Sequence, residues 1–129
     1  YEKQINIEAL TMLDIAKKDI LPAASKFSKE LTDTIANKKA IGIDLTYELE
    51  TAKKVSEYLT EAYQAMMTLE NDVKKLHEID DFEKSAFYVR DFIIQDMAAL
   101  RKPCDELEVI TSNRDWPFPT YGKLLFGIQ

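Results

Sequence analysis

Two neighbouring rows of apolar residues, each repeating every seven positions, run through residues 45–78 and constrain the fold of this chain more than any other feature. One row is Leu45, Ala52, Leu59, Met66 and Val73, and the other is Val55, Ala62, Leu69 and Leu76. Such rows form an apolar stripe on an α-helix, the seam by which helices pack in bundles. The pattern predicts a helix over about 45–78, packed against other helices, with Asp44 or Thr46 capping its start.

Apolar residues at helical spacing predict one further helix on each side. The first covers about 5–40, with a face made of Leu10, Leu13, Ile20, Ala24, Phe27, Leu31 and Ile35. The other covers about 82–112, with a seam made of Phe82, Ala86, Val89, Ile93, Met97, Leu100, Cys104 and Leu107. Pro22 and Pro103 are expected to bend these helices. Gly42 is expected to end the first helix, and Asp80 with Glu83 predicts a capping box before the last.

Connections of a few residues, about 41–44 and 78–81, separate the three predicted helices. Short connections make consecutive helices antiparallel neighbours. The sequence therefore predicts an all-α fold, an elongated antiparallel three-helix bundle with an aromatic C-terminal tail. We expect residues 1–129 to form a single helical domain, with the tail, residues 113–129, docked. Because the chain begins at Tyr1 rather than Met, we also expect a fragment of a longer chain.

The tail contains large apolar side chains in a segment with no helical period. Its core is Trp116-Pro117-Phe118-Pro119-Thr120-Tyr121-Gly122-Lys123-Leu124-Leu125-Phe126. Disordered tails lack such residues, and the two prolines reduce the entropy that docking costs. Trp116, Phe118, Tyr121 and Phe126 are therefore predicted to contact an apolar surface of this chain, of a second copy or of a neighbouring domain.

Two groups of apolar residues exceed what a three-helix core needs. In the first helix, Met12 and Ile15 point away from the main apolar face. In the last helix, residues 86–94 are apolar almost all round because Phe87, Tyr88, Phe92 and Ile94 flank the seam. A helix that is apolar on every side is buried on every side. We expect both groups at one end of the bundle, covered by the tail, a second copy or a missing domain.

Charge and cysteine content restrict the partners and the compartment. The net charge is −6 and the isoelectric point is about 4.8, which argues against nucleic acid or an anionic membrane as the partner. Cys104 is the only cysteine, so an internal disulfide is impossible and a reducing compartment fits. The sequence contains no long apolar run and no signal-peptide pattern. We expect a cytoplasmic protein in which Cys104 is a buried, inert thiol.

Motifs for catalysis or metal binding are missing from the sequence. His77 is the only histidine and stands in the last turn of its helix, where a surface role is expected. There is no zinc-ligand spacing, no glycine-rich phosphate loop and no nucleophile motif. The many carboxylates fit solvated helix faces. The sequence therefore predicts no catalytic, cofactor-binding or metal-ligating residue.

Two blocks of the chain together resemble a known family. The first is Ile5-Asn6-Ile7-Glu8-Ala9-Leu10-Thr11-Met12-Leu13-Asp14-Ile15-Ala16-Lys17-Lys18-Asp19-Ile20-Leu21-Pro22-Ala23, and the second is the closing block from Trp116 to Phe126. This pair, with a helical hairpin between, is similar to the C-terminal region of type III glutamine synthetases, a large bacterial class. The resemblance covers essentially the whole chain and is weaker in the middle.

The resemblance implies a parent enzyme that joins ammonia to glutamate with ATP, uses Mg²⁺ or Mn²⁺ held by glutamates, and forms a large ring-shaped oligomer. In that family the active site lies upstream, in the β-grasp and barrel regions, and none of its motifs occurs here. The chain would be an accessory or assembly domain that contacts the upstream catalytic domain and neighbouring subunits. A free-standing helical adaptor is the alternative, and a small enzyme is the weakest of the three.

Overall fold

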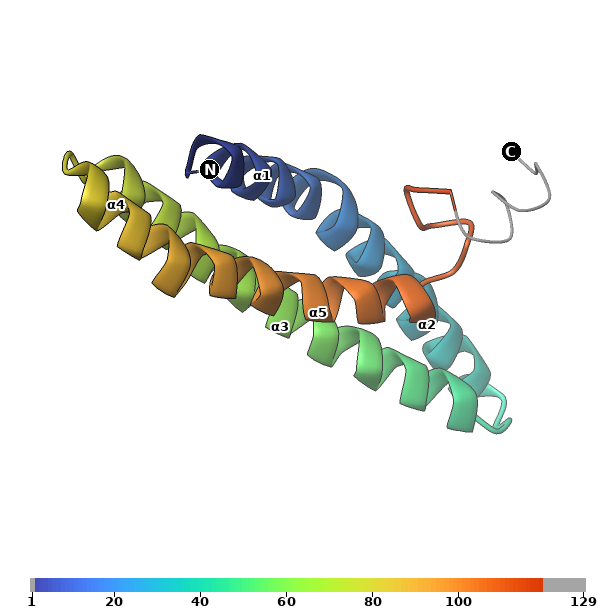
Figure 1. The fold of residues 1–129 in the computed structure, drawn as a ribbon. Helices are drawn as coiled ribbons and strands as arrows, with labels where there is room; N and C mark the ends of the chain where they lie inside the picture. Colours follow the sequence, from blue (N-terminus) through green and yellow to red (C-terminus); the bar gives the residue numbers. More distant parts are fainter. Residues whose placement is uncertain (1, 120–129) are drawn as a thin grey trace.

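The computed structural model describes residues 2–119, and nearly all of this range is helical. The elements in order are α1 (Glu2–Ile15), η1 (Ala16–Ile20), α2 (Leu21–Ala40), α3 (Thr46–His77), α4 (Phe82–Tyr88), η2 (Val89–Ile93) and α5 (Ile94–Ile110), where η marks a π-helical stretch. They join into three continuous helical segments, 2–40, 46–77 and 82–110 (Figure 1). No strand occurs in residues 2–119. The prediction of an all-α chain with three helical segments is confirmed.

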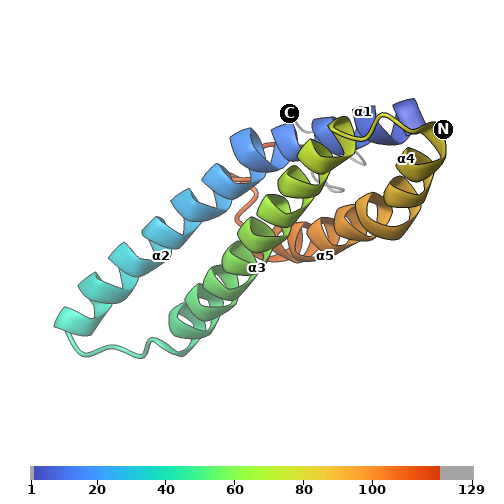
Figure 2. The same ribbon diagram turned by 90° about the vertical axis from the view of Figure 1, so that its left-hand side faces the viewer.

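The first two segments run in opposite directions, as side-chain contacts along their length show. Lys38 of α2 pairs with Glu48 of α3 beside the connecting turn, and Lys17 pairs with Glu70 further along. At the far end, the Oδ1 of Asn6 lies 2.9 Å from the Nε2 of His77. The third segment packs along α3, and α4 lies at the same end of the molecule as the start of α1 (Figures 1 and 2).

The turn after α2 has the geometry of a Schellman motif. The amide of Ile43 donates to the carbonyl of Lys38 and that of Gly42 to Lys39, while Gly42 takes a φ of +74° that favours glycine. The carboxylate of Asp44 then accepts from the amide and hydroxyl of Thr46, the first residue of α3, but the N-cap position itself is Leu45, whose side chain makes no capping hydrogen bond. The predicted cap at Asp80 is wrong, because Asp81 accepts from the amide of Lys84 and caps α4.

The first and the third helical segments are each interrupted by one π-helical stretch, η1 and η2. The amide of Leu21 donates to the carbonyl of Ala16, and the amide of Ile94 donates to Val89, five residues back in each case. Both segments change direction at these stretches (Figure 2). Pro22 stands in the first turn of α2, directly after the first stretch. Pro103 lies inside α5, which continues through it to Ile110.

The π-helical stretch at Ala16–Ile20 also corrects the predicted face of the first segment. Leu10 is 44% exposed, whereas its neighbour Ala9 is fully buried. Leu13 is also buried. An extra residue in one helical turn rotates the preceding helix by about 100° relative to the helix after it, so a face drawn with constant 3.6-residue spacing goes out of phase. Beyond the stretch, Ala24, Phe27 and Leu31 are buried as predicted.

The core follows the seams of α3 and of the third segment. Its largest fully buried side chains are Leu69, Ile93, Leu100, Leu107, Val55, Val89 and Pro103. From the heptad rows Ala62, Met66, Val73 and Leu76 are also buried, while Leu45, Ala52 and Leu59 are half-buried. Phe82 was predicted to begin the third seam, and that is wrong. It is 80% exposed because it opens α4 at the end of the bundle, and burial begins at Val89.

Candidate functional site

An apolar groove of about 370 Å³ lies between α1 and α5. Met12 and Ile15, two of the predicted interaction residues, line its α1 side, and both side chains are half-buried. Their neighbours in the groove are Ile7, Ala16, Ile20, Leu100 and Cys104, with Glu8, Thr11, Arg101 and Asp105 completing the lining. The groove therefore offers an apolar floor with a few charged side chains, which suits apolar side chains of a partner.

The groove contains no activated nucleophile among its lining residues. Burial, together with the negative charge of Asp105, raises the pKa of the Cys104 thiol to about 11. At neutral pH the thiol is therefore protonated, and the thiolate needed for attack is scarce. The prediction that Cys104 is buried is confirmed. Its contribution to the groove is a small apolar surface.

Aromatic side chains stand exposed at the bend formed by α4 and η2. Phe87 is 47% exposed and Phe92 is 48% exposed, while Ile94 is 36% exposed. The guanidinium carbon of Arg90 lies 4.7 Å from the centre of the Phe87 ring, a cation–π contact. That the tail, a second copy or a missing domain covers residues 86–94 stays a prediction, because within the described residues Phe87, Phe92 and Ile94 are exposed. Only Val89 and Ile93 are fully buried, because neighbouring helices cover one side of this bend.

Tyr88 turns inward from this corner into a polar contact between helices. Its ring lies against Phe92, with centroids 4.7 Å apart, and its hydroxyl donates to the Oδ1 of Asp72 in α3 at 2.9 Å. Burial and the hydrogen bond to Asp72 raise the pKa of Tyr88 to about 12. Asp96 of α5 is half-buried, and burial first, then the neighbouring carboxyl of Asp72, raise the pKa of Asp96 to about 7.

The described part of the tail contacts the bundle beside α2. Trp116 is 7% exposed, and Phe118 packs against the core with its ring 6.1 Å from that of Trp116 in an edge-on arrangement. Ion pairs continue the contact, with Arg114 3.4 Å from Glu30 and Asp115 3.5 Å from Lys26. Tyr121 and Phe126 lie outside the described residues, so docking of the whole tail stays a prediction.

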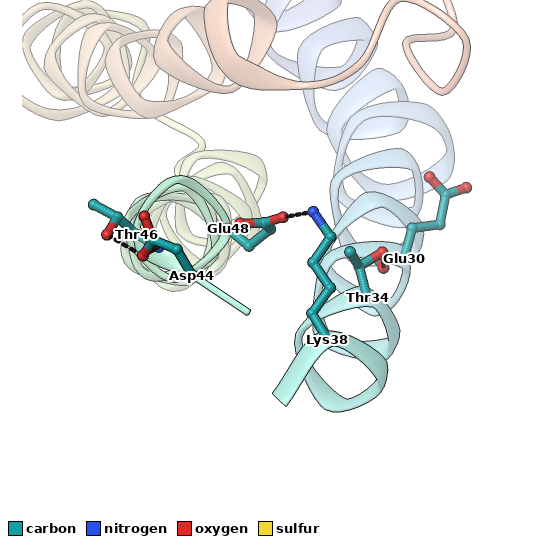
Figure 3. A network of polar contacts seen from close by, with 6 residues as sticks. All are labelled: Glu30, Thr34, Lys38, Asp44, Thr46 and Glu48. Carbon is teal, nitrogen blue, oxygen red and sulfur yellow. Dashed lines mark hydrogen bonds and ion pairs between the residues drawn. The ribbon is translucent and has the colours of Figure 1, made fainter. Parts of the chain in front are cut away.

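A polar network at the α2–α3 end was not predicted from the sequence. Lys38 and Glu48 point toward one another from α2 and α3, and the hydroxyl of Thr34 donates to the carbonyl of Glu30 (Figure 3). Glu48 is only 7% exposed, and the hydrogen bond from Lys38 lowers its pKa. Glu48 stands seven residues before Val55, so it continues one of the heptad rows toward the start of α3. A carboxylate at a position of an apolar row was the sequence feature that could have indicated this ion pair.

A cleft of about 460 Å³ opens beside this network, between α2, the start of α3 and the end of α5. Phe27, Leu31 and Ile110 form its apolar part, while its charged side chains pair with charged neighbours, Glu30 with Arg114 and Glu48 with Lys38. Within residues 2–119 no group of three His, Cys, Asp or Glu residues is arranged to hold a metal ion. Among the same residues no helix is long and apolar enough to cross a membrane.

Comparison with known proteins points to one family. The profile of the glutamine synthetase C-terminal domain matches residues 1–39. The whole chain is 31% identical over 131 residues to a glutamine synthetase of Butyrivibrio fibrisolvens, covering 100% of this chain and 19% of that protein. It is 24% identical to a glutamine synthetase of Bacteroides fragilis and 26% identical to the type-3 glutamine synthetase of Dictyostelium discoideum, each over 98% of this chain and 18% of the relative. The chain thus spans about a fifth of the length of these curated relatives.

Proposed function

Because the chain is homologous over its whole length to the C-terminal part of glutamine synthetases, we propose that it is a non-catalytic accessory domain of such an enzyme. In this proposal the domain is an elongated antiparallel three-helix bundle with an aromatic tail. It serves the packing or assembly of the enzyme through contacts with the upstream catalytic part and with neighbouring subunits. The parent would carry out the ATP-dependent ligation of ammonia to glutamate.

The observation that carries the assembly role is the apolar surface that the bundle leaves open. It comprises the groove between α1 and α5 and, separately, the exposed rings of Phe87 and Phe92 at the bend of α4 and η2. Proteins rarely expose apolar patches of this kind without a partner. About four fifths of the length of the relatives lies outside the matched part, and a domain from that portion is the partner we propose.

The chemistry of the described residues supports a non-catalytic role. The thiol of Cys104 is held protonated, and the charged groups of the cleft beside α2 are paired with one another. We propose that ATP and Mg²⁺ or Mn²⁺ bind in the upstream part of the enzyme. Calorimetric titration of the 129-residue chain with MgATP is then expected to show no stoichiometric site, and a stoichiometric micromolar site would refute this part of the proposal.

The assembly role is tested in the full-length enzyme with a charge placed in the groove. Ile15→Glu puts a carboxylate on the groove wall and should lower the oligomer fraction seen by light scattering, together with the synthetase activity. Gln4→Glu is the matched control, because it adds the same charge at an exposed position of α1 outside the groove. Equal oligomer fractions and activities for the two variants and the unmodified enzyme would refute the role of the groove.

A free-standing adaptor is the alternative that the same groove permits, with a partner helix in place of the upstream domain. The two functions differ in what precedes the chain. An upstream barrel with metal-binding glutamates would establish the first, whereas its absence from the natural polypeptide would favour the second.

A further inference from the structure

The turn between α2 and α3 carries large apolar side chains at a place where polar residues are the rule. Residues 41–47 read Ile-Gly-Ile-Asp-Leu-Thr-Tyr, with one charged side chain among them. Ile41 is 77% exposed, Ile43 is 50% exposed and Tyr47 is 69% exposed. We call these three residues the apolar tip. Single exposed apolar side chains are common, but a group of them in one turn is typical of an interaction surface.

Polar contacts hold the backbone of the apolar tip in one shape. The amide of Ile43 donates to the carbonyl of Lys38 at the end of α2, and the carboxylate of Asp44 accepts from the amide and hydroxyl of Thr46. Behind the turn, Lys38 of α2 pairs with the buried Glu48 of α3 (Figure 3). A surface that is already ordered loses less conformational entropy when a partner binds. The polar network therefore prepares the apolar tip for docking.

The apolar tip stands at the end of the bundle opposite to the start of α1. The start of α1 lies at the end where α4 and η2 bend, whereas the turn between α2 and α3 lies at the other end (Figure 2). The 32 residues of α3 separate these ends by about 48 Å. In the relatives about four fifths of the length lies outside the matched C-terminal part, so a preceding domain would join before Glu2. The apolar tip is thus the part of the bundle farthest from the preceding domain of its own subunit.

We propose that the apolar tip docks on a neighbouring subunit of the parent enzyme, a second copy of the same polypeptide. This inference rests on the proposed function and adds to the groove a separate surface for the contact between subunits. Tyrosine is enriched among the residues that dominate binding at interfaces, because its ring buries a large area and its hydroxyl keeps a polar partner. The only carboxylate of the turn, Asp44, already has hydrogen-bond donors from Thr46 when a neighbour excludes water.

Photocrosslinking in the full-length enzyme tests which surface the apolar tip meets. With p-benzoylphenylalanine in place of Tyr47, irradiation should join two subunits, seen as a band of twice the subunit mass on a denaturing gel. The same replacement at Tyr63, an exposed tyrosine in the middle of α3, is the matched control and should give no such band. Products confined to one subunit, or no product at all from position 47, would overturn the proposal.

Dissociation of the full-length enzyme on dilution measures the strength of the contact. The double variant Ile41→Asp with Tyr47→Ser should raise the concentration of half-dissociation by about thirtyfold, the effect of losing one dominant interface residue. Val109→Asp is the matched control, because it adds the same charge at an exposed position of α5 outside the apolar tip. Since both tip residues are exposed, the double variant should keep the melting temperature of the 129-residue chain. Equal half-dissociation concentrations for the double variant and the control would contradict the proposal.

Failure of this inference can be told apart from failure of the proposed function. If Ile15→Glu dissociates the enzyme and the double variant of the apolar tip does not, the inference is wrong and the assembly role stands. If neither variant dissociates the enzyme, both are wrong. Binding to phosphatidylcholine vesicles that the double variant loses, without a crosslink between subunits, would assign the apolar tip to a lipid surface and overturn the inference.

Discussion

Truncating Leu69 to alanine tests whether the heptad seam of α3 is the centre of the core. Leu69 is fully buried in the last third of α3, a helix that contacts both the first and the third segments. The substitution removes three carbons, worth about 0.8 kcal/mol each on transfer from water, or about 2.4 kcal/mol. The incompletely filled cavity adds to this, so we expect a loss of about 3 kcal/mol in the free energy of unfolding.

Urea and thermal unfolding, followed by circular dichroism and by the fluorescence of the lone Trp116, measure this loss. For 129 residues the entropy of unfolding is about 0.27 kcal/mol per kelvin, so 3 kcal/mol lowers the melting temperature by about 10 °C. With a slope of about 1.5 kcal/mol per molar, the urea midpoint falls by about 2 M.

The neighbouring residue provides the control for this measurement. Thr68 is exposed, and its hydroxyl donates only to the carbonyl of Gln64 in the same helix. Thr68→Ala should change the stability by less than about 0.5 kcal/mol, because nothing packs on this side chain. Similar urea midpoints for Leu69→Ala and Thr68→Ala would show that the seam is misplaced.

Three further predictions concern single features of the structure. Cys104 should react with an aromatic disulfide reagent about a hundredfold more slowly in the folded chain than in denaturant, and equal rates would contradict its burial. Deleting residues 116–129 should lower the melting temperature and increase the binding of an apolar dye, because Trp116 is buried against the bundle. An unchanged melt, with indole-like emission from the intact chain, would show that the tail is not docked. Glu48→Gln should lower the urea midpoint at neutral pH. Since the pKa of Glu48 is lowered in the folded chain, the difference should shrink as the pH falls through that value, and a constant difference would contradict the Lys38 pairing.

The helices and their seams were predictable because they depend on local periodicity. Heptad rows and 3.6-residue spacing identify the buried faces without knowledge of the partner, which is why Val55, Leu69 and Leu107 were assigned to the core before the fold was known. The turn at Gly42 was predictable for the same reason, because the need for a positive φ is a short-range requirement.

The candidate surface was predictable only in part. Met12 and Ile15 were singled out because they are apolar and off the main face, and the structure places both in the groove between α1 and α5. The other wall of that groove, with Leu100 and Arg101, comes from a helix about ninety residues away in the chain. No pattern within one helix reveals which residue of another helix it will face.

By itself, the sequence determined that this chain forms three long helices with apolar seams, and it indicated the family. Tertiary structure alone decided the phase of α1 against α2 and the meeting of Tyr88 with Asp72. The π-helical stretch at Ala16–Ile20 adds a residue to one turn, which puts Ala9 in the core in place of Leu10. Tyr88 and Asp72 meet because the third segment packs on α3, and the burial there, with the hydrogen bond to Asp72, raises the pKa of Tyr88. Both depend on free energies of contact between distant segments, which local propensity does not contain.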